Sequence, residues 1–355
     1  MFRMICRVVI MCAALCGTQV FAEGPVFDIG KLEAITIDGK ADDWGDQGLE
    51  IGIFHSKAPN IPAPTDFQPA CRLAWNDQGV LLFVEMKDDS YIENSSETNI
   101  WRDDAIEFFL ADEKGGKQHV QLLIAPGLAP DQPEVRVCLK NNSVRKPDGI
   151  DKVKAQVARM RIQGGYMLEL LLPWQIIDIS PTLEREIALQ IYFNDHDTDE
   201  TKSKFIWYPS DDTYRNSSSM HRVRLSQGPG PDIRATASAF VENLSWLVVD
   251  VTAVAGLAGE TVTLVHQSHE LATGILKLDN GQAQASLRSR LKQLSPLPES
   301  VQVQFADGKS PSVVTLPDMD ELCAGMIMNA ALRFDPSSVF GTENLPTCSF
   351  VQPLV

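Results

Sequence analysis

The chain has 355 residues and a formal net charge of −16, with 44% hydrophobic and 22% charged residues. This composition supports a folded protein with a sizeable core and excludes a disordered or collagen-like chain. The acidic balance repels phosphate backbones and anionic membrane surfaces, so we expect neither nucleic acid nor lipid as a partner.

Residues 1–22 are typical of a secretory signal peptide. Arg3 and Arg7 precede an apolar run over residues 8–15, and Ala22 ends a suitable cleavage site. The apolar run is too short for a membrane span of about 20 residues. We therefore expect an exported protein, secreted or periplasmic, without insertion into a membrane.

Four cysteines remain once the signal peptide is removed, and they allow three pairings. An exported protein meets an oxidising environment, and pairing within each part of the chain gives two local bridges. We therefore predict the disulfides Cys71–Cys138 and Cys323–Cys348.

The first domain is expected to span residues 23–228 and to consist of short β-type segments. Residues 71–75 and 80–86 flank Asn76-Asp77-Gln78-Gly79, which predicts a hairpin. Further strands are expected over residues 105–110, 119–124, 153–162, 166–172, 186–193 and 221–225. Because no helix intervenes, the pattern predicts an all-β, antiparallel β-sandwich.

The run Gly228-Pro229-Gly230-Pro231 ends this domain, because glycine loosens the backbone and proline removes a hydrogen-bond donor. Residues 229–355 then form a smaller domain, with strands expected over residues 235–241, 245–255, 261–266, 282–291, 300–305 and 312–316. Asp318 and Glu321 make a capping pattern that predicts a helical tail over residues 318–332. The second domain is thus expected to be a small β-sandwich with a helical tail.

Motifs of common catalytic sites are missing from the sequence. It contains no GxSxG, HExxH, Walker or GxGxxG pattern, and acidic pairs such as Asp103-Asp104 arise by chance in an acidic protein. We therefore expect a binding protein rather than an enzyme.

The segment from Asn194 to Glu200 carries carboxylates at Asp195, Asp197 and Asp199. Alternating carboxylates on a turn can converge on Ca²⁺, which makes these three residues candidate metal ligands. The segment lacks the glycine and the closing glutamate of an EF-hand. The alternative is a solvated acidic turn.

Two aromatic residues, Trp101 and Tyr214, lie in segments too polar for a core. An aromatic ring beside hydrogen-bonding groups suits a sugar, because the sugar's C–H face stacks on the ring while its hydroxyls meet polar side chains. Arg215, Asn194 and Asp211 are the candidate polar contacts. The alternative is that each ring packs against a neighbouring strand.

An ordered series of motifs runs through the first domain. It comprises IDGKADDW at residues 37–44, LAWND at 73–77, WRDDAIEFF at 101–109, GYMLE at 165–169, PW at 173–174, FND at 193–195, Trp207, and VRL at 223–225. The series resembles family 9 carbohydrate-binding modules and their relatives in the DOMON superfamily.

This resemblance implies a β-sandwich that holds a polysaccharide or oligosaccharide between two aromatic rings, often with structural Ca²⁺. Trp101 matches the first ring, Tyr214 the second, which is a tryptophan in familiar members, and Glu107 a sugar-binding glutamate. Leu123 stands where a sugar-binding arginine is expected, so a preference for reducing ends is not carried over. The tryptophans at positions 44, 75, 174 and 207 match core positions. Such modules accompany polysaccharide-degrading enzymes, which suggests a non-catalytic accessory role.

Two alternatives stay open. DOMON relatives also hold haem, for which His119 or Met220 would be the candidate axial ligand. A structural or adhesive module without a small ligand is the other. The sequence does not indicate an oligomeric state.

Overall fold

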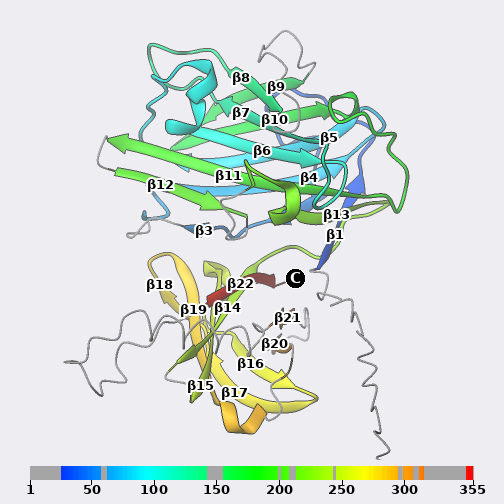
Figure 1. Ribbon diagram of the computed structural model, residues 1–355. Helices are drawn as coiled ribbons and strands as arrows, with labels where there is room; N and C mark the ends of the chain where they lie inside the picture. Colours follow the sequence, from blue (N-terminus) through cyan, green and yellow to red (C-terminus); the bar gives the residue numbers. More distant parts are fainter. Residues whose placement is uncertain are drawn as a thin grey trace, which may run out of the picture.

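The computed structural model describes residues 25–56, 62–141, 155–198, 201–207, 213–242, 245–294, 298, 300–306, 312–315 and 349–354. These residues form two β-sandwiches, one above the other in Figure 1. The predicted signal peptide and the predicted helix over residues 318–332 lie outside the described residues.

The described residues of the first domain form thirteen strands and three short 3₁₀ segments. The strands are β1 (Val26–Lys31), β2 (Leu49–Ile51), β3 (His55–Ser56), β4 (Phe67–Trp75), β5 (Gly79–Asp88), β6 (Ala105–Ala111), β7 (His119–Ala125), β8 (Arg136–Asn141), β9 (Gln156–Ile162), β10 (Gly165–Pro173), β11 (Glu186–Thr198), β12 (Thr201–Ile206) and β13 (His221–Ser226). The 3₁₀ segments are η1 (Glu97–Arg102), η3 (Trp174–Ile176) and η4 (Ser217–Ser219). The six strands and the hairpin predicted from the sequence are all present.

Strand β1 connects the two layers of this sandwich. One layer runs β8-β7-β6-β11-β13, the other runs β4-β5-β10-β9, and β1 pairs in parallel with both β13 and β4. Asp28 lies opposite Arg224 in the β1–β13 register and accepts two hydrogen bonds from its guanidinium, at 2.6 and 2.9 Å. Such bidentate pairs are among the stronger polar contacts in proteins.

The core lies between the layers and follows the period-two alternation of the strands. On β10, Tyr166, Leu168, Leu170 and Leu172 all point into it, as predicted. Three of the four predicted core tryptophans (75, 174 and 207) lie in the same core, and the fourth, Trp44, is buried in a smaller cluster.

Glu169 lies on the opposite face of β10 and is completely buried. Its carboxylate accepts hydrogen bonds from the Trp44 indole Nε1 at 2.8 Å and from the backbone N–H of Gly39 at 2.6 Å. Because Gly39 has a φ of +83° and its Cβ position would fall 2.8 Å from the Arg159 carbonyl carbon, only glycine fits this close approach. Glu169 therefore fixes the segment over residues 37–44 on the outside of the sheet.

The second domain consists of a five-stranded and a four-stranded sheet. Its strands are β14 (Ala235–Glu242), β15 (Trp246–Val254), β16 (Thr261–His266), β17 (His269–Ile275), β18 (Lys277–Asp279), β19 (Gln282–Arg290), β20 (Ser300–Phe305), β21 (Ser312–Thr315) and β22 (Ser349–Leu354). The sheet orders are β18-β19-β15-β14-β22 and β17-β16-β20-β21. Small and branched residues such as Ala237, Val249 and Leu264 form its separate core.

The two domains meet just after the predicted boundary. Ile233 packs in the core of the first domain and forms an isolated parallel bridge with Ile51. The backbone N–H of Gly52 donates to the Ile233 carbonyl at 3.1 Å. The chain thus leaves the first domain at Ile233 and enters β14 immediately.

The predicted disulfide Cys71–Cys138 is wrong. Both residues are buried, and they form no disulfide with each other. Cys71 points from β4 into the main core, whereas Cys138 points from β8 into a cluster on the outer face of its sheet, next to Ile100 and Leu123. The other predicted pair, Cys323–Cys348, lies outside the described residues.

Within the described residues, no helix has the length and apolar character that crossing a membrane requires.

Candidate functional site

Strand β6 places a glutamate on the outer face of the first sandwich. Ile106, Phe108 and Leu110 point into the core, so Glu107 and Phe109 point to the opposite side. Glu107 is only 3% exposed although it faces away from the core. A carboxylate buried in this way needs hydrogen-bond donors around it.

Three neighbouring strands supply those donors. Glu107 Oε2 accepts from Gln121 Nε2 at 2.6 Å, and Oε1 accepts from Asn194 Nδ2 at 2.9 Å and from Lys204 Nζ at 2.8 Å. Gln121 lies on β7, Asn194 on β11 and Lys204 on β12. Lys204 also lies over the ring of Tyr192, with Nζ 4.9 Å from the centroid. We call Glu107, Gln121, Asn194 and Lys204 the Glu107 cluster.

The sugar-binding roles predicted for Glu107 and Asn194 stay predictions, but the Glu107 cluster places these two residues in direct contact. Glu107 and Asn194, both candidate sugar-binding residues, are hydrogen bonded to each other. Gln121 and Lys204 were not predicted. A single glutamine or lysine in a short polar strand does not indicate a binding site in the sequence. Gln121 and Lys204 reach Glu107 only through the register of β7 and β12.

Leu123 lies directly opposite Glu107 in the β6–β7 register and is fully buried. It packs with Ile100 and Cys138 beneath η1. The position therefore contributes apolar packing, and the donor from β7 is Gln121, two residues earlier on the same face.

Trp101 lies in η1, immediately before β6. Its side chain is 39% exposed, and the Arg102 guanidinium lies 5.2 Å from the ring centroid. η1 packs against β6, β7, β8 and β11, so it holds Trp101 at the edge of the face that carries Glu107. The ring is presented to solvent rather than packed in a core.

Tyr214 lies in the segment between β12 and β13. It is 43% exposed, with the Arg215 guanidinium 5.0 Å from its ring centroid. Ser217, three residues later, donates from Oγ to the carbonyl of Gly116 in the β6–β7 turn at 2.6 Å. Trp101 and the segment of Tyr214 are therefore fixed at opposite ends of β6. Asp211, the remaining candidate, lies outside the described residues.

The two haem-ligand candidates lie near the same end of β6. His119 is paired with Ala111 in the β6–β7 register, and burial lowers its pKa below the usual value. Met220 is buried in an apolar cluster with Phe109, Ala111 and Tyr192.

The predicted calcium loop has a different structure from the one expected. Asn194 to Thr198 continue strand β11, which pairs with β12 up to a register shift after His196. The core-facing positions of β11 run Ile191, Phe193, Asp195, Asp197, so the apolar core gives way to carboxylates at one end of the sandwich. Asp199 lies outside the described residues.

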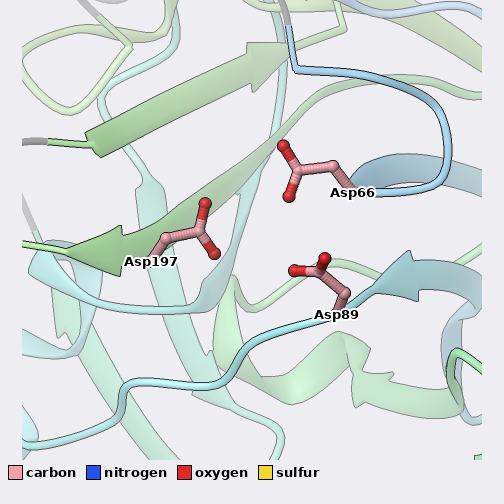
Figure 2. Close-up of side chains that lie close together, drawn as sticks. All are labelled: Asp66, Asp89 and Asp197. Carbon is pink, nitrogen blue, oxygen red and sulfur yellow. The ribbon is translucent and has the colours of Figure 1, made fainter.

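Asp197 meets two aspartates from other segments at this end. Ligand oxygens of Asp66, Asp89 and Asp197 all lie within 4.8 Å of one another, and Figure 2 shows the three carboxylates pointing toward a shared space. Asp66 precedes β4 and Asp89 follows β5, so the other layer provides both. We call these three residues the aspartate triad.

Three further aspartates lie behind the triad and are almost completely buried. Burial, together with neighbouring carboxylates, raises the pKa of Asp88 to about 8 and that of Asp104 to about 9. Burial and the charges of Asp197 and Asp66 raise the pKa of Asp195 to about 7. So many carboxylates cannot ionise together at neutral pH without a compensating positive charge.

The residues of this end fit a bound Ca²⁺. Oδ2 of Asp195 and Oδ1 of Asp197 are buried and accept no hydrogen bond from the part of the chain that the structure describes, so each has ligand capacity left there. Ca²⁺ takes carboxylate and backbone oxygens in a flexible shell, and hard oxygen donors are the only ligand type that the aspartate triad offers. The triad contains Asp197, one of the three predicted ligands, together with Asp66 and Asp89, and its role in metal binding stays a prediction.

A family model and solved structures of known proteins both match this chain. Residues 37–228 match the family model described as carbohydrate family 9 binding domain-like. The chain is similar to a carbohydrate binding module family 9 from Caldicellulosiruptor kristjanssonii in complex with cellotriose, with 14% identity and a TM-score of 0.44 over 57% of this chain and 94% of that chain. The same module in complex with glucose gives 14% identity and a TM-score of 0.44 over 56% and 94%. No curated protein matched the chain.

Proposed function

The chain belongs to the carbohydrate family 9 binding domain-like family through residues 37–228, and from this premise we propose that it binds a soluble glycan or the end of a polysaccharide chain. The family is one of non-catalytic binding modules, which agrees with the expectation of a binding protein rather than an enzyme. The family also favours a sugar over haem as the ligand.

The observation that carries the proposal is the Glu107 cluster on the outer face of β6, between two exposed aromatic residues. Core positions would bury Trp101 and Tyr214, yet both rings face solvent. The segments that carry the two rings are fixed at opposite ends of β6, a seven-residue strand about 20 Å long, so a glycan of several sugar units would be needed to reach both rings. A glycan chain that stacks on Trp101 and extends along β6 toward Tyr214 would direct its hydroxyls toward the Glu107 cluster.

The Glu107 cluster has hydrogen-bonding capacity left for such a ligand. The Lys204 ammonium has three protons and gives one to Glu107, and the Asn194 amide keeps a second N–H and its carbonyl oxygen. Glu107 orients both side chains, while Arg102 and Arg215 hold the aromatic rings. Hydrogen bonds to a sugar replace hydrogen bonds to water, so we expect weak binding, in the micromolar to millimolar range or about −8 to −4 kcal/mol.

A glycan array followed by titration calorimetry tests this proposal. Trp101→Ala should abolish detectable binding, because it removes the larger of the two proposed stacking rings and the hydrogen bonds alone give little net affinity. Leu278→Ala, which truncates an exposed apolar side chain on β18, is the matched control and should bind as the wild type does. Equal affinity of wild type and Trp101→Ala would overturn the proposed site.

We further propose that the aspartate triad holds a structural Ca²⁺, with Asp195 as an additional ligand. When bound, the ion would neutralise carboxylates that otherwise repel one another. Asp66 and Asp89 come from one layer and Asp197 from the other, so their joint ligation would tie the layers together at this end.

Export and an accessory role complete the proposal. Residues 1–22 would be removed as a signal peptide, and the mature protein would attach to polysaccharide substrates of secreted hydrolases. Mass spectrometry of the protein from the culture medium or periplasm should find Glu23 at the amino terminus. Incubation with polysaccharide should give bound protein and no released sugar; released oligosaccharides would contradict a non-catalytic role.

A further inference from the structure

The second domain has an outer sheet face lined by short polar side chains. On β14, β15 and β19, residues such as Ala237 and Val249 point into the core, so the alternate residues point outward. The register places these outward residues in two adjacent rows: Thr236, Thr252 and Gln284 in one, and Ser238, Asp250 and Ser286 in the other. We call these six residues the polar rows.

The polar rows form the floor of a hollow of about 420 Å³, and His55 of the first domain lines it as well. This volume falls within the range of small-molecule sites, roughly 300–1,000 Å³. The hollow exists because the six side chains are short. The next outward positions of β19 carry Arg288 and Arg290, whose long side chains lie over the Trp246 ring.

The side chains of the polar rows have unused hydrogen-bonding capacity. Within the described residues, none of the six makes a hydrogen bond or ion pair through its side chain. Four hydroxyls and one carboxamide can each donate and accept, and one carboxylate accepts only. Such a set matches a ligand that carries many groups able both to donate and to accept hydrogen bonds.

The charges that line the hollow limit further which chemical class of ligand can bind there. Asp250 is the charged group of the polar rows, and Lys277 lies beside Gln284 at their edge, so the two opposite charges together favour a neutral ligand. The Trp246 ring on this face is not available for stacking on a sugar, because the Arg290 guanidinium lies 3.8 Å from its centroid. Binding would therefore depend on hydrogen bonds to several hydroxyls at once, which a short neutral oligosaccharide supplies.

We propose that this hollow is a second carbohydrate site that takes a neutral oligosaccharide. It is built from the second domain and His55, shares no residue with the Glu107 cluster, and does not rest on the function proposed for that cluster. The two sites lie on one chain, so a long glycan could engage both.

Saturation-transfer NMR on the full-length protein tests the proposal with cellotriose, maltotriose and xylotriose as probes. Trp101→Ala removes the first proposed site and should leave saturation transfer to at least one probe. Adding Gln284→Ala, or Ser238→Leu to fill the hollow, should abolish the remaining transfer. Adding Gln302→Ala instead, an outward-facing glutamine on β20 of the other sheet, should leave it intact.

Circular dichroism and melting curves check that each variant folds. Loss of all transfer in Trp101→Ala alone would overturn the second site, as would transfer that survives both Gln284→Ala and Ser238→Leu. Equal transfer in wild type and Trp101→Ala, lost on Gln284→Ala, would support the second site and refute the first.

Discussion

Chelation of calcium is expected to lower the melting temperature of the first domain by about 6 to 12 °C, since each kcal/mol shifts a domain of this size by roughly 2–4 °C. The perturbation is EDTA in place of excess Ca²⁺ at neutral pH. Without the ion, the three carboxylates of the aspartate triad repel one another across distances of at most 4.8 Å.

Coulomb's law gives the size of this effect. Two unit charges about 4 Å apart interact by about 1 kcal/mol in a water-like dielectric, which suits a triad that is partly exposed, and three pairs give about 3 kcal/mol. Mass action gives a similar figure, because a ligand at a hundred times its dissociation constant stabilises the folded state by about 2.7 kcal/mol.

Differential scanning calorimetry measures the shift. Asp89→Asn should reduce it at least by half, because the amide is a poorer ligand and lowers the repulsion in EDTA. Asp46→Asn, on an exposed turn outside the triad, should show the full shift. Equal melting temperatures in Ca²⁺ and EDTA for the wild type would refute the reasoning.

Three further predictions concern single side chains. Gln121→Ala should weaken sugar binding about tenfold in calorimetric titration, because Glu107 loses a donor and one charge-assisted hydrogen bond corresponds to about 1.5 kcal/mol or more. Unchanged affinity would show that Gln121 has no role in sugar binding. Burial lowers the pKa of His221 to about 3. Between pH 6.5 and pH 3 the unfolded chain therefore binds a proton at this histidine and the folded protein does not, so in urea titrations the stability of the wild type should fall relative to that of His221→Gln by about 1.4 kcal/mol per pH unit. Parallel curves of stability against pH for the two proteins would contradict this. Glu169→Ala should destabilise the first domain by about 3 kcal/mol in the same titrations, since it leaves buried donors such as the Trp44 indole unsatisfied. A loss below about 1 kcal/mol would show that Glu169 does not fix the segment over residues 37–44.

The strands with regular alternation could be predicted from the sequence, because one face must enter the core. Residues 166–172 show this most clearly, and the structure places the predicted face inward. The same logic failed at Asn194 to Thr198, where polar residues suggested a turn. Pairing with β12 continues the strand there, and local composition contains no information about that distant partner.

The candidate sites could be predicted only in part, for the same reason. Glu107 and Asn194 came from motifs, whereas Lys204 reaches Glu107 through the register of a short strand. Asp66 and Asp89 approach Asp197 because two layers meet at one end of the sandwich. The cysteine prediction failed because Cys71 and Cys138 point to different faces, a property that follows from sheet order rather than from distance along the chain.

The parallel pairing of β1 with β13 determines how the first domain would respond to mechanical load. When the first domain is held at its amino-terminal end and pulled through the second domain, the force runs along β1 and β13, since the chain passes from β13 directly to the linker. The first and last strands of the domain run side by side in the same direction, so tension on the two ends slides one along the other. In this shear geometry the backbone hydrogen bonds between Val26–Arg222 and Gly30–Ser226, and the Asp28–Arg224 pair, share the force and break together instead of opening one by one.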